Sequence, residues 1–451
     1  MVIGIIISLW AILAIYLGMS LYFMNHFYFG SSINAINVSG KNVEAVNAQL
    51  ASELHTYTLN IKERGGKNEQ IKGEEVGLSY NSDTKFKEFK DKQNPYKWVL
   101  AVFNSEDSHM IEGVKYDKLL LKERLDKLSC FDSSNIVEPK NASFKYTDNG
   151  YIIVGEVDGT KVSSDILYDY VAAAILKEET TIDLESINCY VQPQYTSKSL
   201  KTIHTLNTLN KYVFSKITYT FGKQKETLDG STINKWLTVD DNLNVTFDEK
   251  EIKNYIDVLS DSHNTIGATR SFITSKRKTI TIGGGDYGWS INRVKETQAL
   301  ITLLKSGQTI TKEPAYIQTA ISHSNSDIGN TYVEIDLTNQ HLWFYKNGNL
   351  ISQGDIVTGN MSSNHGTPRG IYKLKYKQKD AVLRGADYAA PVSFWMPFNG
   401  GIGIHDANWR GSFGGNIYKT SGSHGCINSP YYLAKAIFNN IEAGTPVVCY
   451  N

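Results

Sequence analysis

The residues best suited to chemistry lie near the carboxyl end, in the segments GIHDANWRG (403–411) and SGSHGCINSP (421–430). A cysteine thiol with a reference pKa of about 8.5 is mostly protonated at neutral pH. A nucleophilic Cys426 therefore needs an imidazole that raises its thiolate fraction or takes its proton during attack. His424 would face the same side of an extended segment, and His405 would have to reach the sulfur from a neighbouring strand.

The glycine between His424 and Cys426 suggests a second catalytic feature. Because Gly425 has no side chain, the backbone can turn so that the amides of residues 424–426 converge on a developing oxyanion. On this hypothesis, activity rises with pH through a thiol-linked ionisation. A single Cys426 would be interpreted as a buried core residue, because free cysteine is among the most buried residue types. The surrounding pattern favours a nucleophile instead.

The alternative chemistry is a metal-dependent peptidase, whose zinc ligands would be His405, His424, Cys426 and His365. A catalytic zinc site also needs an acid that activates water, and Glu442 is the only glutamate in the last 100 residues. The sequence therefore favours a thiol enzyme with no metal and no organic cofactor. EDTA would spare such an enzyme, and iodoacetamide would inactivate it.

At these residues the chain resembles L,D-transpeptidase catalytic domains of the YkuD type. The signature of that family is a histidine, a spacer, and then Ser or Thr, His, Gly, Cys, an apolar residue and Asn. Here His405 is followed by 17 residues and then by SHGCIN (423–428). Upstream, TG (358–359) and TPRGIY (367–372) resemble the strand and turn that build the family's substrate cleft. The resemblance covers about residues 331–451.

The resemblance implies that Cys426 is the nucleophile and that His405 is the general base, which later acts as an acid. The residues implied to form the oxyanion hole and shape the site are Ser423, His424, Gly425 and Asn428. The implied reaction is acyl transfer: the thiol attacks the third residue of a tetrapeptide stem, D-alanine leaves, and the side-chain amine of another stem takes the thioester. The product is a 3-3 peptidoglycan cross-link, and carbapenems are expected to acylate the same thiol.

Two other functions fit the same domain. If water is the acceptor in place of an amine, the enzyme is an L,D-carboxypeptidase. If the site is vestigial, the protein is a non-catalytic wall-binding scaffold. The complete motif from His405 to Asn428 argues against the scaffold.

Length and composition limit the remaining interpretation. A chain of 451 residues predicts about three folded units at roughly 150 residues each. The 46 basic and 46 acidic side chains cancel, which argues against a nucleic-acid binder, and a hydrophobic content of 41% argues against disorder. Of the four cysteines, Cys449 fits a terminal apolar strand, and Cys130 and Cys189 either pair or are buried free thiols.

The amino-terminal segment predicts a membrane anchor. Val2 to Met24 contains no charged residue, and its 23 residues would span a bilayer as a helix. A cleaved signal peptide is less consistent with this length and with the missing basic n-region. We expect a single-pass protein with its catalytic domain on the extracellular, cell-wall side. The aromatic residues predicted to form an interfacial belt are Tyr22, Phe23, Phe27, Tyr28 and Phe29.

A Gly-x-x-x-Gly pattern recurs three times in the middle of the chain, at 73–77, 155–159 and 284–288. The segments before the second and third copies, Tyr151 to Val154 and Thr279 to Ile282, are β-branched or aromatic and read as strands, and the glycines indicate turns. Ser163 and Asn292 then occupy the positions expected of helix N-caps. The sequence therefore predicts repeated α+β modules, the first of them degenerate.

Residues 33–316 resemble the peptidoglycan-binding modules of Gram-positive cell-wall enzymes, the kind shared with VanW-like proteins. The resemblance rests on the segments INAINVSGKNVEAVNAQL (33–50), LDGSTINKWL (228–237) and TITIGGGDYGWSIN (279–292). Binding to glycan strands is implied by the resemblance alone. A spacer that lifts the catalytic domain off the membrane would contain the same turn and core residues.

The expected fold is multidomain, with a transmembrane helix, α+β modules and a mainly β, sandwich-like catalytic domain. The expected boundaries are 1–29 for the anchor, 30–135, 136–205 and 206–321 for three α+β modules, and 331–451 for the catalytic domain. Within that last domain, alternation from Tyr372 to Lys379 predicts one strand that buries Tyr372, Leu374 and Tyr376.

Overall fold

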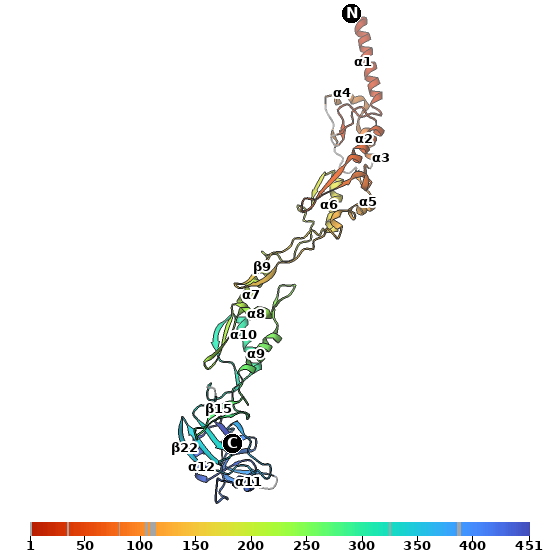
Figure 1. Ribbon diagram of the computed structural model, residues 1–451. Helices are drawn as coiled ribbons and strands as arrows, with labels where there is room; N and C mark the ends of the chain where they lie inside the picture. The colour runs from red at the N-terminus through yellow and green to blue at the C-terminus, as the bar shows by residue number, and fades with distance from the viewer. Residues whose placement is uncertain are drawn as a thin grey trace. The chain divides into compact units, whose positions relative to one another are not determined.

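The computed structural model describes residues 2–33, 36–80, 82–103, 107–108, 114–323, 326–385 and 389–451. The chain divides into two compact units, one formed by Met1–Phe144 with Ile153–Thr202 and the other by Lys145–Ile152 with Ile203–Asn451 (Figure 1). An apolar helix opens the first unit, helices and sheets mix through the middle, and the carboxyl-terminal part is rich in sheet. This confirms the predicted multidomain class.

Helix α1 (Val2–Tyr22) is long and apolar enough to cross a membrane, a property that a signal sequence shares. The aromatic belt predicted after it is only partly correct. Phe23, Phe27 and Tyr28 are 1%, 0% and 5% exposed, because they pack within the first unit. Tyr22 and Phe29 remain exposed, at 38% and 45%.

The part of the first unit next to α1 is small and mixed. Its short strands are β1 (Ser32–Ile33), β2 (Ile36–Asn37), β5 (Ser79–Tyr80), β6 (Asp107–Ser108) and β7 (Val114–Lys115), and its helical segments are α2 (Val43–Thr56), α3 (Ser82–Lys92), η2 (Pro95–Lys97) and α4 (Trp98–Ala101). The Asn42 side chain caps α2 by accepting from the amide of Ala45, and Val46, Leu50 and Leu54 turn one apolar stripe of that helix into the core.

A three-stranded module follows, with strand order β10-β3-β4. The hairpin of β3 (Thr58–Lys62) and β4 (Asn68–Lys72) is antiparallel, and β10 (Thr181–Asp183) joins β3 in parallel. The other elements of the module are η1 (Gly73–Val76), α5 (Lys118–Leu125), η4 (Ser129–Phe131) and α6 (Ser164–Leu176), and hairpin β8 (Ser143–Thr147) with β9 (Gly150–Val154) lies across the division between the two units.

The second unit contains the same arrangement. Strands β11 (Lys216–Phe221) and β12 (Gln224–Leu228) form the hairpin, and β18 (Thr309–Lys312) joins β11 in parallel. The other elements of this module are α7 (Leu200–Val213), α8 (Gly230–Ile233), η5 (Asn234–Trp236), β13 (Leu237–Val239), β14 (Val245–Phe247), α9 (Glu249–His263) and α10 (Arg293–Ser306). Ser163 and Asn292 occupy the N-cap positions of α6 and α10, as predicted, although only the Asn292 side chain accepts a capping bond.

The described residues contain two copies of this module, whereas the glycine pattern predicts three. Gly73 corresponds to Gly230, because each follows a hairpin and approaches the end of an earlier helix. A Cβ on Gly73 would lie 2.3 Å from the carbonyl oxygen of Leu54, and a Cβ on Gly230 would lie 2.4 Å from that of Val213. The first glycine pair therefore belongs to the same copy as the second, at a different turn.

The core of the first module draws residues from both sides of the expected boundary at 135. Leu59 and Leu121 pack in one cluster with Val171 and with the thiols Cys130 and Cys189. Both cysteines are free and buried. The segments expected as separate modules, 30–135 and 136–205, thus share a hydrophobic core.

The second module packs against the carboxyl-terminal domain through hairpin β15 (Arg270–Ile273) and β16 (Thr279–Ile282), followed by β17 (Ser290–Ile291) and its partner β19 (Tyr316–Gln318). Phe272 and Tyr287 share a core cluster with Ile371 and Val448 of the carboxyl-terminal domain. Gly285 has a φ of +83°, and a Cβ there would lie 2.1 Å from the carbonyl oxygen of Ile371. Only glycine permits this close approach.

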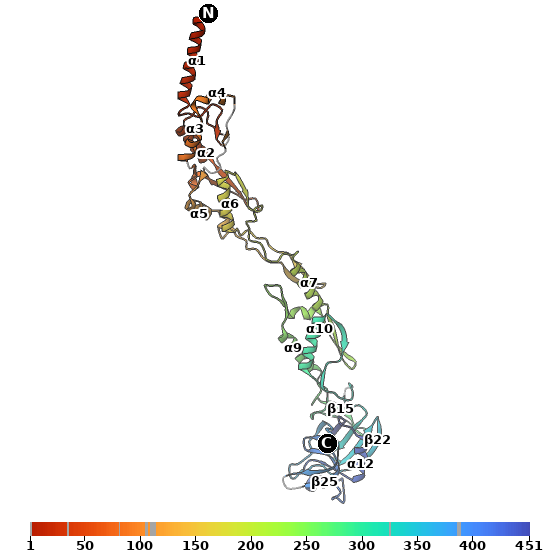
Figure 2. The same ribbon diagram turned by 180° about the vertical axis from the view of Figure 1, so that it is seen from behind.

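The carboxyl-terminal domain has two sheets with a core between them (Figure 2). The first has the order β22-β21-β20-β28-β23, from β20 (Tyr332–Asp336), β21 (His341–Lys346), β22 (Asn349–Asp355), β23 (Gly370–Lys373) and β28 (Pro446–Tyr450). The second has the order β24-β25-β26-β27, from β24 (Gln378–Arg384), β25 (Ala389–Asn399), β26 (Ile402–Asp406) and β27 (Ile427–Ser429). Helices α11 (Ile417–Ser421) and α12 (Tyr431–Asn440) complete the domain, and Leu433 and Ile437 of α12 join its core.

The single strand predicted from Tyr372 to Lys379 is wrong. Strand β23 ends at Lys373 and β24 begins at Gln378, since the chain crosses from one sheet to the other between them. The amide of Lys375 bonds to the carbonyl oxygen of Pro397 during this crossing. Tyr372 and Leu374 are buried as predicted, but Tyr376 is 51% exposed.

Candidate active site

Two parallel strands bring together the residues of the predicted catalytic motif. Strands β26 and β27 pair with Ile404 opposite Ile427 and His405 opposite Asn428. Residues directly opposite each other on paired strands project to the same face of the sheet, so Asn428 and His405 share one face. Cys426 immediately precedes β27 and lines the same cavity as both. His405 therefore lies on the strand that pairs with β27, the strand that Cys426 precedes.

His405 is nearly completely buried, with 3% of its surface exposed. Its Nδ1 lies 2.8 Å from the carbonyl oxygen of Asp406. A carbonyl can only accept, so Nδ1 carries a proton and Nε2 is the basic nitrogen. Burial lowers the pKa of His405, and the positive charge of Arg410 acts in the same direction, while the Asp406 carbonyl opposes them. The ring is therefore held neutral and in one tautomer.

Asn428 connects the imidazole to an arginine that the sequence analysis missed. With its amide turned to satisfy both neighbours, the Asn428 nitrogen donates to His405 Nε2 at 3.0 Å. Its oxygen accepts from Arg410 Nε at 2.7 Å and Nη2 at 3.3 Å. Arg410 Nη1 donates to the carbonyl oxygen of Ser421 at 2.9 Å. The guanidinium thus fixes which end of the amide faces the histidine.

The Cys426 side chain is half-buried and lies at the edge of the cavity. Its sulfur is 3.6 Å from the carbonyl oxygen of Gly401, a contact that a protonated thiol can make as donor. Burial raises the pKa of Cys426, and the backbone N–H of Gly403 partly offsets that effect. With the pKa of the neighbouring imidazole lowered, the resting pair is a neutral thiol beside a neutral imidazole.

The turn before Cys426 is closed by the hydroxyl of Ser423. This hydroxyl donates to the carbonyl oxygen of Cys426 at 2.6 Å and accepts from the amide of Gly425 at 3.1 Å. Gly425 has a φ of +115°, which only glycine adopts readily, and a Cβ there would lie 3.1 Å from Ile402. Of the three amides expected to face an oxyanion, that of Gly425 is therefore engaged by Ser423.

His424 does not lie on an extended strand with Cys426, because the chain turns at Gly425 before β27 begins. The His424 side chain is exposed, and its ring centroid lies 4.8 Å from that of His365. The arrangement places His424 at the rim of the cavity, which it lines, and leaves His405 as the buried imidazole.

The segments TG (358–359) and TPRGIY (367–372) pack against the turn at residues 423–426 that precedes β27. Thr367 Oγ1 donates to the carbonyl oxygen of Gly425 at 2.7 Å and accepts from the amide of Gly359 at 3.1 Å. A Cβ on Gly359 would lie 2.9 Å from the Cα of Gly425 and 1.9 Å from the carbonyl oxygen of His365. The backbone of the cysteine turn is therefore packed directly on another backbone.

A cavity of about 280 Å³ opens over these groups. Its lining residues are Leu383, Ala390, His405, Trp409, Arg410, Gly422, Ser423, His424, Cys426 and Asn428. The ring of Trp409 is 54% exposed and lies 5.9 Å from the His405 ring, whereas Trp395 is buried beside the same histidine. A larger cavity of about 1130 Å³ lies beside Trp289 and contains none of the predicted site residues, whereas five of the six line the smaller one.

The chain matches two families. Residues 330–449 match the family described as "L,D-transpeptidase catalytic domain" (YkuD), and residues 69–183 and 195–311 match the "Putative peptidoglycan binding domain". A crystal structure of an Enterococcus faecium L,D-transpeptidase mutant is 35% identical, with 55% of this chain and all of that chain covered and a TM-score of 0.48. The chain belongs to the L,D-transpeptidases.

Other members of the family are also similar. The NMR structure of the E. faecium catalytic domain acylated by ertapenem is 43% identical, covering 27% of this chain and 98% of that chain at a TM-score of 0.26. An L,D-transpeptidase from Mycobacterium smegmatis is 22% identical, covering 27% and 59% at a TM-score of 0.24. No curated protein matched significantly. The protein is thus an L,D-transpeptidase with peptidoglycan as its substrate partner.

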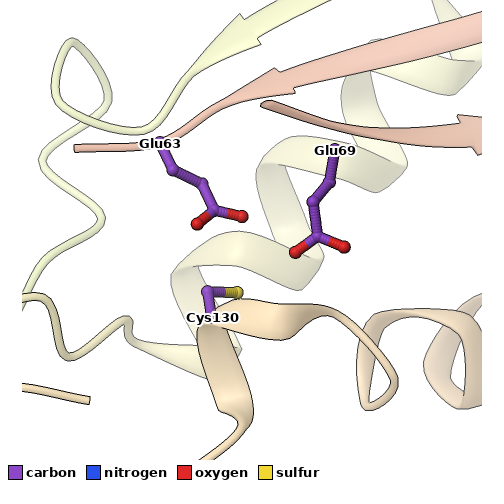
Figure 3. A group of neighbouring side chains, drawn as sticks. All are labelled: Glu63, Glu69 and Cys130. Atoms are coloured by element: carbon purple, nitrogen blue, oxygen red, sulfur yellow. The ribbon is translucent and has the colours of Figure 1, made fainter. Parts of the chain in front are cut away.

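One group of three side chains among the described residues brings possible metal-ligand atoms within 4.8 Å of one another, and it lies in the first unit (Figure 3). Its members are Glu63, Glu69 and Cys130. Burial, with Glu69 adding to it, raises the pKa of Glu63 to about 7, and burial raises that of Cys130 to about 12. The amide of Ser129 donates to Glu69 at 2.6 Å. The group contains no residue of the L,D-transpeptidase cavity.

The sequence contains one signal for Arg410 that the motif search did not use. Arg410 is the only basic residue between His405 and the next lysine, Lys419. A buried histidine and asparagine need a fixed hydrogen-bond partner, and a guanidinium on the connecting segment can supply one. Its exact partner still depends on how the spacer folds back, which the sequence alone does not give.

Proposed function

We propose that this L,D-transpeptidase forms 3-3 cross-links between peptidoglycan stems through a thioester on Cys426. The observation that supports the proposal is the cavity shared by Cys426, His405 and Asn428, the last two of which lie opposite each other on paired parallel strands. The family membership supplies the class of reaction. The arrangement supplies a thiol and one basic nitrogen facing the same space.

In the first half-reaction, Cys426 attacks the carbonyl carbon of the third residue of a tetrapeptide stem. Because both partners rest neutral, His405 Nε2 gives up its hydrogen bond from Asn428 and takes the thiol proton as the carbon–sulfur bond forms. The oxyanion faces the backbone amides of residues 424 and 426, because the amide of Gly425 donates to Ser423. The bond to D-alanine then breaks, and the imidazolium returns its proton to the leaving amine.

In the second half-reaction, the side-chain amine of another stem attacks the thioester. His405 Nε2 removes a proton from that amine, the new amide bond forms, and the carbon–sulfur bond breaks to restore the thiol. A thioester remains reactive toward amines, which suits an intermediate that waits for an acceptor. Transfer to water instead would release a tripeptide stem, the L,D-carboxypeptidase outcome.

We further propose that α1 holds the protein in the cell membrane and that residues 331–451 act on the wall side. The two matched peptidoglycan-binding modules would then lie along the chain between the anchor and the active site. Their contact with glycan strands remains part of the proposal, because a spacer would have the same turn and core residues.

The test is incubation of the full chain with purified tetrapeptide muropeptides, followed by mass spectrometry of the products and of the protein. We expect cross-linked dimers, and a transient adduct that peptide mapping assigns to Cys426. The Cys426→Ala variant should yield neither, while Ser421→Ala, an exposed change next to the motif, should behave as wild type. Tripeptide monomers alone would indicate the carboxypeptidase, and an adduct on Cys449 would overturn the assignment.

A further inference from the structure

A short segment of the first unit lies against the apolar helix α1. It begins at Asn94, passes through η2 and α4, and reaches Phe103. Both views show α4 beside the end of α1 that leads into the rest of the chain (Figure 1, Figure 2). The sequence analysis assigned this segment no role.

Aromatic contacts attach the segment to α1. The Tyr16 hydroxyl of α1 donates to the carbonyl oxygen of Tyr96 at 2.7 Å, and the Tyr16 and Trp98 ring centroids are 6.2 Å apart. Phe23 lies one residue beyond α1, and its ring centroid is 5.9 Å from that of Trp98. A helix that was removed as a signal peptide would take Tyr16 away from these partners.

Buried polar contacts fix the start of the segment as well. Gln93 is 5% exposed, its Oε1 accepts from the amide of Tyr28 at 3.1 Å, and its Nε2 donates to Ser31 Oγ at 3.0 Å. The Tyr28 hydroxyl donates to the carbonyl oxygen of Asn94. The segment is therefore held in place beside the helix end from both directions.

The outward side of this segment is apolar. Its exposed fractions are 54% for Tyr96, 41% for Val99, 62% for Leu100, 55% for Val102 and 81% for Phe103. Single exposed apolar residues are ordinary on a protein surface, but a contiguous group of this kind indicates a partner.

The position of the segment along α1 identifies that partner. Tyr16 precedes the helix end at Tyr22 by six residues, which is about 9 Å of helix. The 21 residues of α1 extend about 31 Å, close to the thickness of a bilayer's hydrocarbon core. When α1 spans the membrane, the contact with Tyr16 places the segment at the depth of the outer hydrocarbon and headgroup region.

We infer that Pro95–Phe103 inserts into the lipid bilayer beside α1 and forms a second membrane contact. Tyr96 and Trp98 have the amphipathic rings that favour the interface. Lys97 is exposed and can extend its amine to the headgroups. Two membrane contacts would fix the rotation of the first unit about α1, which a single helix does not. The inference rests on the proposed anchor but not on the proposed chemistry.

The test is spin-label accessibility in the full chain reconstituted into phosphatidylglycerol and phosphatidylethanolamine vesicles, in a Cys426→Ser background. A label at Leu100→Cys is compared with one at Leu9→Cys in α1 and one at Leu119→Cys, a leucine of α5 that is 74% exposed. We expect the labels at 100 and 9 to be reached by oxygen and shielded from an aqueous nickel complex. The label at 119 should be reached by nickel.

Each other result overturns a distinct step. If 9 is in lipid and 100 behaves as 119 does, the second contact is wrong and the anchor stands. If 9 is also in water, the anchor itself is wrong. If 100 is shielded from both oxygen and nickel, a protein partner covers the segment and lipid does not. Muropeptide cross-linking by the unlabelled chain with Cys426 intact reports the proposed chemistry separately.

Discussion

Replacing Gly359 with alanine should separate catalysis from folding. The added Cβ would lie 1.9 Å from the carbonyl oxygen of His365, 2.8 Å from the amide nitrogen of Thr367 and 2.9 Å from the Cα of Gly425. Real Cβ contacts below 3.0 Å essentially never occur, so the backbones must separate by about 1 Å. Gly425 adjoins the cysteine, so this movement displaces the sulfur from the imidazole.

A misplacement of about 1 Å at reacting atoms costs about 100-fold in rate, or about 2.7 kcal/mol of transition-state stabilisation. Overpacking of this kind costs about 1–3 kcal/mol of unfolding free energy, which is a fall of several degrees in the melting temperature. We therefore expect Gly359→Ala to remain folded at 25 °C and to lose about 100-fold in kcat/KM.

The assay measures D-alanine release from a tetrapeptide muropeptide, together with thermal unfolding of the same samples. Gly411→Ala is the matched control, because nothing lies within 4 Å of a Cβ at that glycine of the same cavity-forming region. The reasoning is refuted if Gly359→Ala keeps the wild-type kcat/KM. It is also refuted if activity falls only in proportion to the unfolded fraction.

Three further predictions concern the neutral pair, its arginine and the junction between module and catalytic domain. Burial lowers the pKa of His405, so kcat/KM should rise with pH along an acid limb whose midpoint lies below the ordinary histidine pKa of about 6.5. Burial raises the pKa of Cys426, so ultraviolet spectra near neutral pH should contain no thiolate band. Arg410→Met should shift the midpoint of that limb to higher pH, because the guanidinium charge lowers the pKa of His405. It should also reduce kcat/KM about 10- to 100-fold, because the Asn428 contacts are lost. Arg410→Lys keeps the positive charge but not the paired contacts, so its limb should stay near the wild-type pH while kcat/KM falls. Gly285→Ala should lower the melting temperature and leave kcat/KM nearly unchanged. The backbone strain of a positive φ, about 1–2 kcal/mol, and the clash with Ile371 both lie where the second module packs on the catalytic domain, away from the cavity. An unchanged unfolding curve would contradict this contact.

The pH prediction revises the one drawn from sequence. A reference thiol pKa and a neighbouring imidazole suggest that the rise of activity with pH follows the thiol. The structure buries both groups, which moves the two pKa values apart in the direction that keeps the pair neutral. The ionisation that controls the acid limb is then that of His405, the base, and its measured midpoint decides between the two interpretations.

The sequence predicted a mainly β catalytic domain because strand and turn patterns are local. Asn347 and Gly348 lie at the turn between β21 and β22, and an Asn-Gly pair is such a local turn signal. The crossing between Tyr372 and Gln378 could not be predicted, because alternation continues through it and only the distant Pro397 carbonyl distinguishes it from a strand. The glycine repeat is a second such case. The pair at 73–77 matches the pattern, but it lies at a different turn of the module that also contains the pair at 155–159.

The positions of neighbouring residues in the candidate site could be predicted where they follow one another along the chain. Positions that depend on which distant segments pack together could not. Ser423 through Asn428 form one short turn and strand, so the motif alone placed them together. Phe23 and Phe27, by contrast, follow an apolar helix and read as lipid-facing, yet they are buried by the protein. Burial of an aromatic residue depends on what packs over it, which local pattern does not encode.

The 17-residue spacer between His405 and Ser423 gains a physical role from Arg410. The spacer leaves the end of β26 and must cross back to the start of β27, because the two strands are parallel. Arg410 lies within it and bonds both to Ser421, near its end, and to Asn428 on the returning strand. The loop thereby tightens the register that holds His405 opposite Asn428. Length can vary in such a loop, provided that a guanidinium still reaches the asparagine and sets the amide that faces the base.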